Sequence, residues 1–190
     1  TPPEAWIVRA LIDRLPPGSL LFSGNSMPIP EIDSWSGTGD RPLRIVANRG
    51  VSGIDGNIST LAGLAAAHPG RTAGLIGDLA FYHDMNGLLA VRDQELVLVV
   101  LNNGGGGIFG YLPQAGLEEF EEGWLAPTGL DPEKAAGLYA IPFQRVEHAP
   151  DFGPALEVAL ENPGPQMIEV MIDRAASLAM HRRYWAATAH

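Results

Sequence analysis

Short apolar runs alternate with amphipathic stretches along this chain, a pattern typical of an α/β protein. The apolar runs predict strands that are buried on both faces of a sheet. Stretches with apolar residues three or four positions apart predict the helices between them. We expect strands at 19–23, 43–47, 72–76, 95–101, 142–146 and 166–172, and helices at 4–15, 31–35, 57–67, 79–92, 131–139, 151–161 and 175–187.

Helices that connect consecutive strands favour right-handed crossovers, and these set the strands in parallel. The sequence therefore predicts a single α/β domain over residues 1–190. We expect it to be a three-layer, doubly wound domain in which a mostly parallel six-stranded sheet carries helices on both faces.

A polar cluster is expected where two neighbouring strands end. Gly77-Asp78 follows the third predicted strand, and Asn102-Asn103 with the glycine run 104–107 follows the fourth. A right-handed crossover sets these strands roughly 4.8 Å apart with their carboxyl ends at one edge. Carboxylate, amide and carbonyl oxygens suit Mg²⁺ when phosphate oxygens complete its octahedron. The combination predicts a metal-bridged diphosphate, although Asp78 considered alone is more often a helix cap.

Two further turns follow predicted strands. Residues 24–28 follow the first strand, and the glycine-spaced residues 48–56 follow the second and lead into a helix of small residues. Open α/β sheets bind ligands at the carboxyl ends of their strands. We therefore expect both turns at the site, while spacing alone fits a plain turn and a tightly packed helix equally well.

Composition excludes several other classes of protein. A net charge of −10 disfavours nucleic acid as a partner, because phosphate binding needs a basic surface. The absence of cysteine excludes disulfides and thiolate metal sites, which is compatible with the cytoplasm, where we expect the protein. No apolar run approaches the roughly 18 residues of a membrane span. The first residue is Thr1, so we expect a processed chain or part of a longer one.

Gly77-Asp78, with Asn102-Asn103 about two dozen residues later, resembles the signature of thiamine-diphosphate enzymes. Leu79, where glycine is usual, and the glycine run leading into Ile108-Phe109 are similar to one family among them. That family is the 2-succinyl-5-enolpyruvyl-6-hydroxy-3-cyclohexene-1-carboxylate synthases of menaquinone (vitamin K2) biosynthesis. They are transferases, or carboligases, that decarboxylate 2-oxoglutarate and add the succinyl unit to isochorismate. The resemblance covers nearly the whole chain and implies the carboxyl-terminal, diphosphate-binding third of such an enzyme.

The resemblance implies thiamine diphosphate as cofactor, with Mg²⁺ or Mn²⁺ as its metal. Gly53 would offer its carbonyl to the amino group of the cofactor, and Ile54 would support the bent cofactor from below. Asn102 is expected to support the turn. The metal ligands would be the side chains of Asp78 and Asn103 and the carbonyl of Gly105, and backbone groups along the diphosphate would come from Gly77, Leu79, Ala80, Gly106, Gly107 and Ile108.

Both substrates of the family carry carboxylates, which an arginine binds with two parallel hydrogen bonds. On the family match Arg49 is the main candidate, with Ser26 and Phe109 beside it. Considered alone, a loop arginine is more often one partner of a weak surface ion pair. Pro30 occupies a position where relatives carry a further arginine. Either Arg41 or Arg44 compensates for it, or the substrate pocket differs.

The family's catalytic glutamate lies on the amino-terminal, pyrimidine-binding domain of a second subunit, and no glutamate of this chain matches it. We therefore expect a homodimer or a dimer of dimers, weak binding of the diphosphate end and no turnover by this chain alone. One alternative is another thiamine-diphosphate enzyme, either a 2-oxoacid decarboxylase or an acetolactate-type synthase. The other is a Rossmann-like nucleotide-binding module, which the absence of Gly-x-Gly-x-x-Gly after the first strand disfavours.

Two remaining regions carry weaker expectations. Residues 111–130 predict a long loop whose acidic cluster at 118–122 is either a solvated surface or part of a mobile lid. We expect the three residues His181-Arg182-Arg183, in the tail, to lie at the surface or at a subunit contact. His83 and His148 are expected to have ordinary structural roles rather than catalytic ones.

Overall fold

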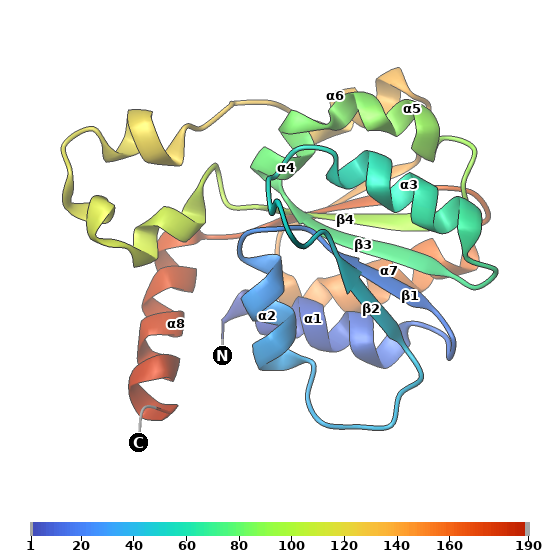
Figure 1. Cartoon of the computed structure of the whole chain (residues 1–190), viewed down its shortest axis with the longest axis horizontal. Coiled ribbons are helices and arrows are strands. Elements are labelled where there is room, and N and C mark those ends of the chain that lie inside the picture. Colours follow the sequence, from blue (N-terminus) through green and yellow to red (C-terminus); the bar gives the residue numbers. More distant parts are fainter. Residues whose placement is uncertain (1, 189–190) are drawn as a thin grey trace.

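The sheet of this protein is entirely parallel and has six strands. The structure is a computed structural model that describes residues 2–188. Figure 1 shows the sheet at the centre, with strand order β2-β1-β3-β4-β6-β5 and parallel pairing throughout. The strands are β1 Leu20–Ser23, β2 Arg44–Ala47, β3 Thr72–Gly77, β4 Leu96–Asn102, β5 Phe143–Val146 and β6 Gln166–Met171.

Helices cover both faces of the sheet, which confirms the predicted three-layer, doubly wound fold. Side chains of β4 alternate between the two faces, so Val97 and Val99 enter one core while Leu98 and Val100 enter the other. The first core is closed by α1 Pro3–Arg14, α2 Pro28–Trp35 and α7 Phe152–Glu161. The second is closed by α3 Asn57–Ala67, α4 Asp78–His83, α5 Leu88–Val91 and α6 Pro132–Leu138.

The chain reverses its direction of winding between β1 and β3. From β1 it moves outward to β2, then crosses back to β3 on the other side of β1 and continues to β4. Such a switch point leaves a crevice at the carboxyl ends of the strands, where ligands bind in open α/β sheets. Gly77 pairs with Leu101 in register, so Asp78 lies beside Asn102 as the sequence predicts.

Two helices differ from their predicted bounds. Helix α2 begins at Pro28 rather than at 31. Proline is tolerated in the first turn because the amide hydrogens there have no carbonyl partner within the helix. The helix predicted over 79–92 is interrupted at Asp84, followed by a 3-10 turn, Met85–Gly87, before α5. The interruption turns the Asp84 carboxylate toward α3, where it accepts hydrogen bonds from the Ser59 amide and hydroxyl at 2.7 and 3.0 Å.

The predicted long loop contains short helical segments. These are the 3-10 turns η2 Gly107–Tyr111 and η3 Pro113–Gly116 and the π-helical turn η4 Phe120–Leu125. Figure 1 shows them as an arm beside the last helix, α8 Arg174–Thr188, away from the sheet. His181 in α8 is buried, so its prediction as a surface or subunit-contact residue is wrong. No helix within residues 2–188 combines the length and apolarity that a membrane span requires.

Candidate cofactor and metal site

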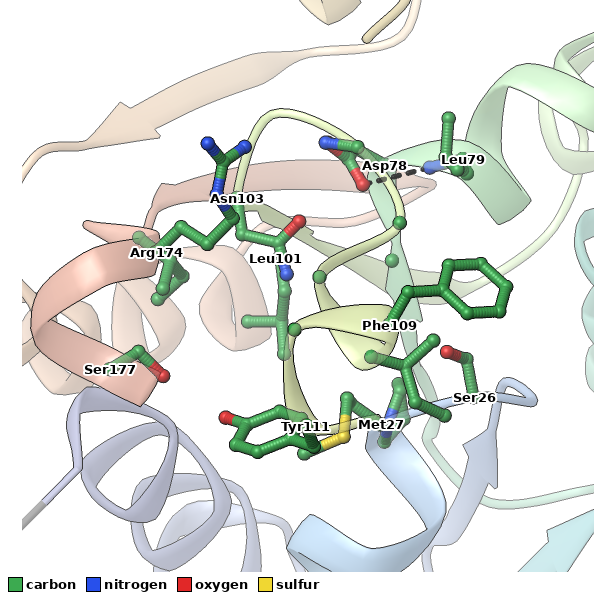
Figure 2. A pocket seen from close by; sticks show the side chains of 18 of the residues that line it. Ser26, Met27, Asp78, Leu79, Leu101, Asn103, Phe109, Tyr111, Arg174 and Ser177 are labelled. Atoms are coloured by element: carbon green, nitrogen blue, oxygen red, sulfur yellow. Dashed lines mark hydrogen bonds between the residues drawn. The ribbon is translucent and has the colours of Figure 1, made fainter. Parts of the chain in front are cut away.

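Asp78 joins the two loops that follow β3 and β4. One carboxylate oxygen accepts a hydrogen bond from the Leu79 amide at 2.9 Å, and the other accepts one from the Gly105 amide at 2.7 Å. Asp78 is the first residue of α4 and not its N-cap, which is Gly77, and its side chain holds the glycine loop in place. Figure 2 shows Asp78 and Asn103 near each other above the cavity.

The charges at this corner are unbalanced. Burial raises the pKa of Asp78 to about 6, because desolvation outweighs its hydrogen bonds to backbone amides. None of the ion pairs formed within residues 2–188 includes Asp78. The Asn103 Oδ1 atom is also buried and has no hydrogen-bond partner. A buried carboxylate and a free amide oxygen form a donor set that fits a hard divalent cation such as Mg²⁺ or Mn²⁺.

Asn102 supports the loop from behind. Its Nδ2 donates to Glu169 Oε1 at 2.6 Å, and its Oδ1 accepts from the Gly104 amide at 3.1 Å. Glu169 is almost fully buried in β6, and its other oxygen accepts from Arg145 Nε at 2.7 Å. Asn102 thus fixes the turn, in agreement with the supporting role predicted for it.

The glycines leave no room for side chains in this loop. Gly105 has a φ of 134°, a conformation that side-chain-bearing residues rarely adopt. A Cβ on Gly106 would lie 2.6 Å from the Trp124 carbonyl oxygen. The Gly105 carbonyl accepts from the Gly107 amide at 2.8 Å, whereas its own amide faces Asp78. Backbone groups and close packing therefore shape this part of the site.

A cavity of about 590 Å³ lies below this corner and brings most of the predicted site residues together (Figure 2). Arg49 is the exception, because it is exposed and does not line the cavity. The Arg41 guanidinium contacts both the backbone carbonyl and the carboxylate of Asp13. Arg41 therefore faces the opposite edge of the sheet. The predicted residues that line the cavity are Ser26, Gly53, Ile54, Gly77, Asp78, Leu79, Ala80, Asn103, Gly105, Gly106, Gly107, Ile108 and Phe109.

The turn after β1 is tied to the turn after β2. Asn25 is buried, and its Nδ2 donates to the Gly53 carbonyl at 2.6 Å. Ser26 has a φ of 75°, which is uncommon for a residue with a side chain and typical of constrained functional turns. Their position after a strand was the signal that pointed to them. It did not reveal that Asn25 and Gly53 contact each other.

The wall formed by α8 was missed by sequence reasoning. Arg174, Ser177, Leu178 and Arg182 line the cavity, as does Glu4 from α1. Nothing in their spacing distinguishes a helix at a site from a helix on a surface. Their role depends on how α8 packs against α1 and α2, which is a property of the tertiary structure.

That packing rests on a buried polar cluster of Glu4, Glu31, Ser177 and His181. The Ser177 hydroxyl donates to Glu4 Oε1 at 2.6 Å, and His181 Nε2 lies 2.9 Å from Glu31 Oε1. His181 Nδ1 lies 2.9 Å from the Ser177 carbonyl, which can only accept, so this nitrogen carries a hydrogen. Nδ1 is therefore a donor, and Nε2 lies at ion-pair distance from Glu31 although the geometry is not that of a hydrogen bond, so the cluster suits an ion pair better than a metal.

The fold and the site define a thiamine-diphosphate-binding domain. Residues 36–170 match the family described as the thiamine pyrophosphate enzyme, C-terminal TPP binding domain. The match covers well over half of the chain, and the chain belongs to this family. Thiamine diphosphate is thus the cofactor that the family assignment supports.

Among curated proteins, the chain is similar to 2-succinyl-5-enolpyruvyl-6-hydroxy-3-cyclohexene-1-carboxylate synthases. It is 43% identical to that of Bacillus pumilus over 95% of this chain and 32% of the relative. It is 45% identical to that of Thermobifida fusca over 98% of this chain and 34% of the relative. The resemblance seen in the motifs is thereby confirmed. The chain spans about a third of the length of these relatives.

Solved structures confirm the fold. Benzoylformate decarboxylase from Polynucleobacter necessarius matches with a TM-score of 0.72 at 20% identity, over 88% of this chain and 32% of that one. The thiamine diphosphate-dependent 4-hydroxybenzoylformate decarboxylase of Rhodococcus jostii RHA1 gives 0.70 at 22% identity, over 90% of this chain and 32% of that one. At these identities the likeness concerns the fold alone.

Proposed function

We propose that this chain is the cofactor-binding domain of a thiamine-diphosphate-dependent carboligase. The full-length enzyme decarboxylates 2-oxoglutarate and adds the succinyl unit to isochorismate. The observation that carries the proposal is the identity of 43% and 45% to synthases of this kind over nearly the whole chain. The decarboxylases that share the fold are only 20% and 22% identical, which favours the synthase over a decarboxylase.

Asp78 and the Asn103 side chain hold Mg²⁺ or Mn²⁺, together with the Gly105 carbonyl. Support comes from the buried, unpaired Asp78 carboxylate and the Asn103 Oδ1 atom without a partner. The Gly105 carbonyl accepts from the Gly107 amide and keeps a second lone pair for the cation.

Backbone groups of the same two loops line the diphosphate, and two further residues support the rest of the cofactor. The amides at the start of α4 suit the negative charge of phosphate, although the Leu79 amide already donates to Asp78. Ile54 presents an apolar side chain to the cavity, and the Gly53 carbonyl faces the same region while Asn25 donates to it. The residues that line the diphosphate are Gly77, Leu79, Ala80, Gly106, Gly107 and Ile108.

When bound, thiamine diphosphate supplies the stabilisation of the carbanion that decarboxylation leaves behind. The residues of this chain bind and orient. Ser26 and Phe109 line the cavity and contact substrate there. Phe109 packs edge-on to Trp124, with 5.2 Å between ring centroids, and this contact fixes the orientation of its ring. Arg49 contacts a substrate carboxylate, although it does not line the cavity in the isolated chain.

The site is completed by other parts of the full-length enzyme. The chain forms one domain, the carboxyl-terminal third of the protein, as its coverage of the relatives suggests. The pyrimidine-binding domain of a second subunit in a homo-oligomer supplies the glutamate that this chain lacks. The chain by itself therefore turns nothing over.

The test is isochorismate-dependent consumption of 2-oxoglutarate by the intact protein with Mg²⁺ and thiamine diphosphate. Carbon dioxide release from a 2-oxoacid without any need for isochorismate would instead assign another thiamine-diphosphate enzyme. Calorimetric titration with NAD and with thiamine diphosphate separates these two thiamine-diphosphate enzymes from a nucleotide-binding module, which would bind NAD instead. Product formation by residues 1–190 alone would contradict the incomplete site.

A further inference from the structure

The cavity has a second end, opposite the Asp78 corner. Figure 2 shows Met27 and Tyr111 there, with Ser177 of α8 beside them. Arg182 lines the cavity too, and its Nη2 donates to the carbonyl of Gly110, the residue before Tyr111, at 3.1 Å. The α8 wall therefore brings a guanidinium to the end of the cavity that the diphosphate corner leaves open.

Two arginines line the cavity, and they differ in what they contact. Arg174 Nη2 lies 3.3 Å from Glu121 Oε1, so its charge already has a carboxylate partner. Arg182 takes part in none of the ion pairs formed within residues 2–188, and its side chain contacts the Gly110 carbonyl. A guanidinium has five N–H donors in a planar fork that matches a carboxylate. Most of the donors of Arg182 are available to a ligand.

Arg182 is also held in position, because its neighbour His181 is part of the buried polar cluster. The ion pair from His181 to Glu31 fixes α8 against α2, and the bond from Ser177 to Glu4 fixes it against α1. Arg182 follows His181 in α8, and its guanidinium contacts the carbonyl of Gly110. The packing of α8 fixes the backbone at Arg182, and the bond to the Gly110 carbonyl orients its otherwise exposed side chain.

We propose that Arg182 forms a carboxylate-binding subsite at this end of the cavity and binds one carboxylate of the substrates there. The inference rests on the proposed function, since both proposed substrates are carboxylates. It makes Arg182, rather than Arg41 or Arg44, the cation that serves in the absence of an arginine at position 30.

The groups around this subsite are compatible with an anion. Burial raises the pKa of Tyr111 to about 12, so its phenol stays protonated at neutral pH and can donate a hydrogen bond. Glu4 also lines the cavity; burial raises the pKa of its carboxyl, and its Oε1 accepts a hydrogen bond from the Ser177 hydroxyl. Glu31 is compensated by His181. The charge of Arg182 is therefore not cancelled within the cavity.

Three variants of the intact protein test the subsite: Arg182→Ala, Arg182→Lys and, as matched control, Arg183→Ala. Arg183 is the next residue of α8 and does not line the cavity. Loss of a charge-assisted, bidentate contact predicts about a 10- to 100-fold fall in kcat/KM for Arg182→Ala, carried by the KM of at least one substrate. Arg182→Lys should retain part of kcat/KM, because the lysine ammonium is a point charge that cannot form the bidentate contact. The control stays within about twofold.

Calorimetry with succinate, a simple dicarboxylate probe, tests binding without turnover. We expect affinity for succinate to fall at least about tenfold in Arg182→Ala, while affinity for thiamine diphosphate with Mn²⁺ is unchanged. Unchanged KM values and unchanged succinate binding would overturn the subsite, and so would an equal loss in Arg183→Ala or a parallel loss of cofactor affinity. A wild-type protein that binds succinate through Arg182 but does not use isochorismate would contradict only the proposed function.

Discussion

The two ends of the cavity are built from different materials. At the Asp78 corner, short loops follow directly from the buried strands β3 and β4, and most contacts are made by backbone groups. At the opposite end, side chains of α8 meet α1, α2 and the arm of short helical turns. The first end is fixed by the sheet itself. The second depends on the docking of one helix.

The difference shows in how each end is stabilised. Asn102, Glu169 and Arg145 form a chain of short hydrogen bonds behind the metal corner, within and beside the sheet. The far end relies on the buried pair of His181 and Glu31 between two helices. Damage to the far end should therefore destabilise part of the fold, whereas damage to the corner should mainly cost ligand affinity.

The largest expected effect is at the far end, in His181→Ala. Removal of the imidazole leaves the almost fully buried Glu31 without its charged partner and with only the hydrogen bond from Trp35 Nε1, which costs about 3–5 kcal/mol. Urea unfolding followed by tryptophan fluorescence measures it, because Trp185 lies on α8 and packs against His181. The exposed His148 is the matched control, and His148→Ala should change stability by less than about 0.5 kcal/mol.

The same pair predicts a pH dependence. Burial alone lowers the pKa of His181, but Glu31, the Ser177 carbonyl and Glu4 together outweigh burial, so the pKa is raised above the ordinary value of 6.5. The stabilisation is thus fully present below pH 6.5 and is lost as pH rises through the higher folded value. His181→Ala should remove this part of the pH dependence. A wild-type stability that rises over the same interval would contradict the ion pair.

Asp78→Asn should have the next largest effect, and at the other end. The change keeps the shape of the side chain but removes the charge that a divalent cation needs, so Mn²⁺-dependent affinity for thiamine diphosphate should fall about 100-fold or more. Calorimetry measures the affinity, and the thermal midpoint should fall only slightly, because asparagine keeps one of the two acceptor oxygens that bond the Leu79 and Gly105 amides. Asp93→Asn, at an exposed ion pair with Arg92, is the control. Equal affinities in the two variants would sink the metal assignment.

Asn102→Ala should have a smaller effect, because Asn102 acts through the turn. It removes both the bond to Glu169 and the bond from the Gly104 amide, and supporting partners of this kind are worth about 10- to 100-fold in metal affinity. Asn162→Ala makes the same chemical change at the end of α7, where Asn162 donates to the Val158 carbonyl. Mn²⁺ affinity measured by paramagnetic relaxation should fall in the first variant only. An equal loss in both would show that the turn is not what carries the effect.

The contrast also explains what sequence could reveal. The Asp78 corner was predictable, since a crossover between consecutive strands fixes which loops meet and the loops are short. The break at Asp84 was not predictable, because it depends on hydrogen bonds between Asp84 and Ser59, which lies in another helix. The α8 wall was hidden for the same reason. His181 is polar and is followed by two arginines in the sequence, and only its contacts in the structure show that it is buried.

The smallest expected effect separates the two ends most directly. Arg49→Ala removes an exposed guanidinium outside the cavity, so affinity for thiamine diphosphate with Mn²⁺ should change by less than about twofold. Its family match instead predicts a higher KM for a carboxylate substrate in the intact protein. A twofold or greater loss of cofactor affinity would mean that the turn after β2 couples the two ends, through the bond from Asn25 to Gly53. Unchanged cofactor affinity with a raised KM would mean that Arg49, like Arg182, binds substrate rather than cofactor. The two arginines would then contact the substrate from different elements, the turn after β2 and α8.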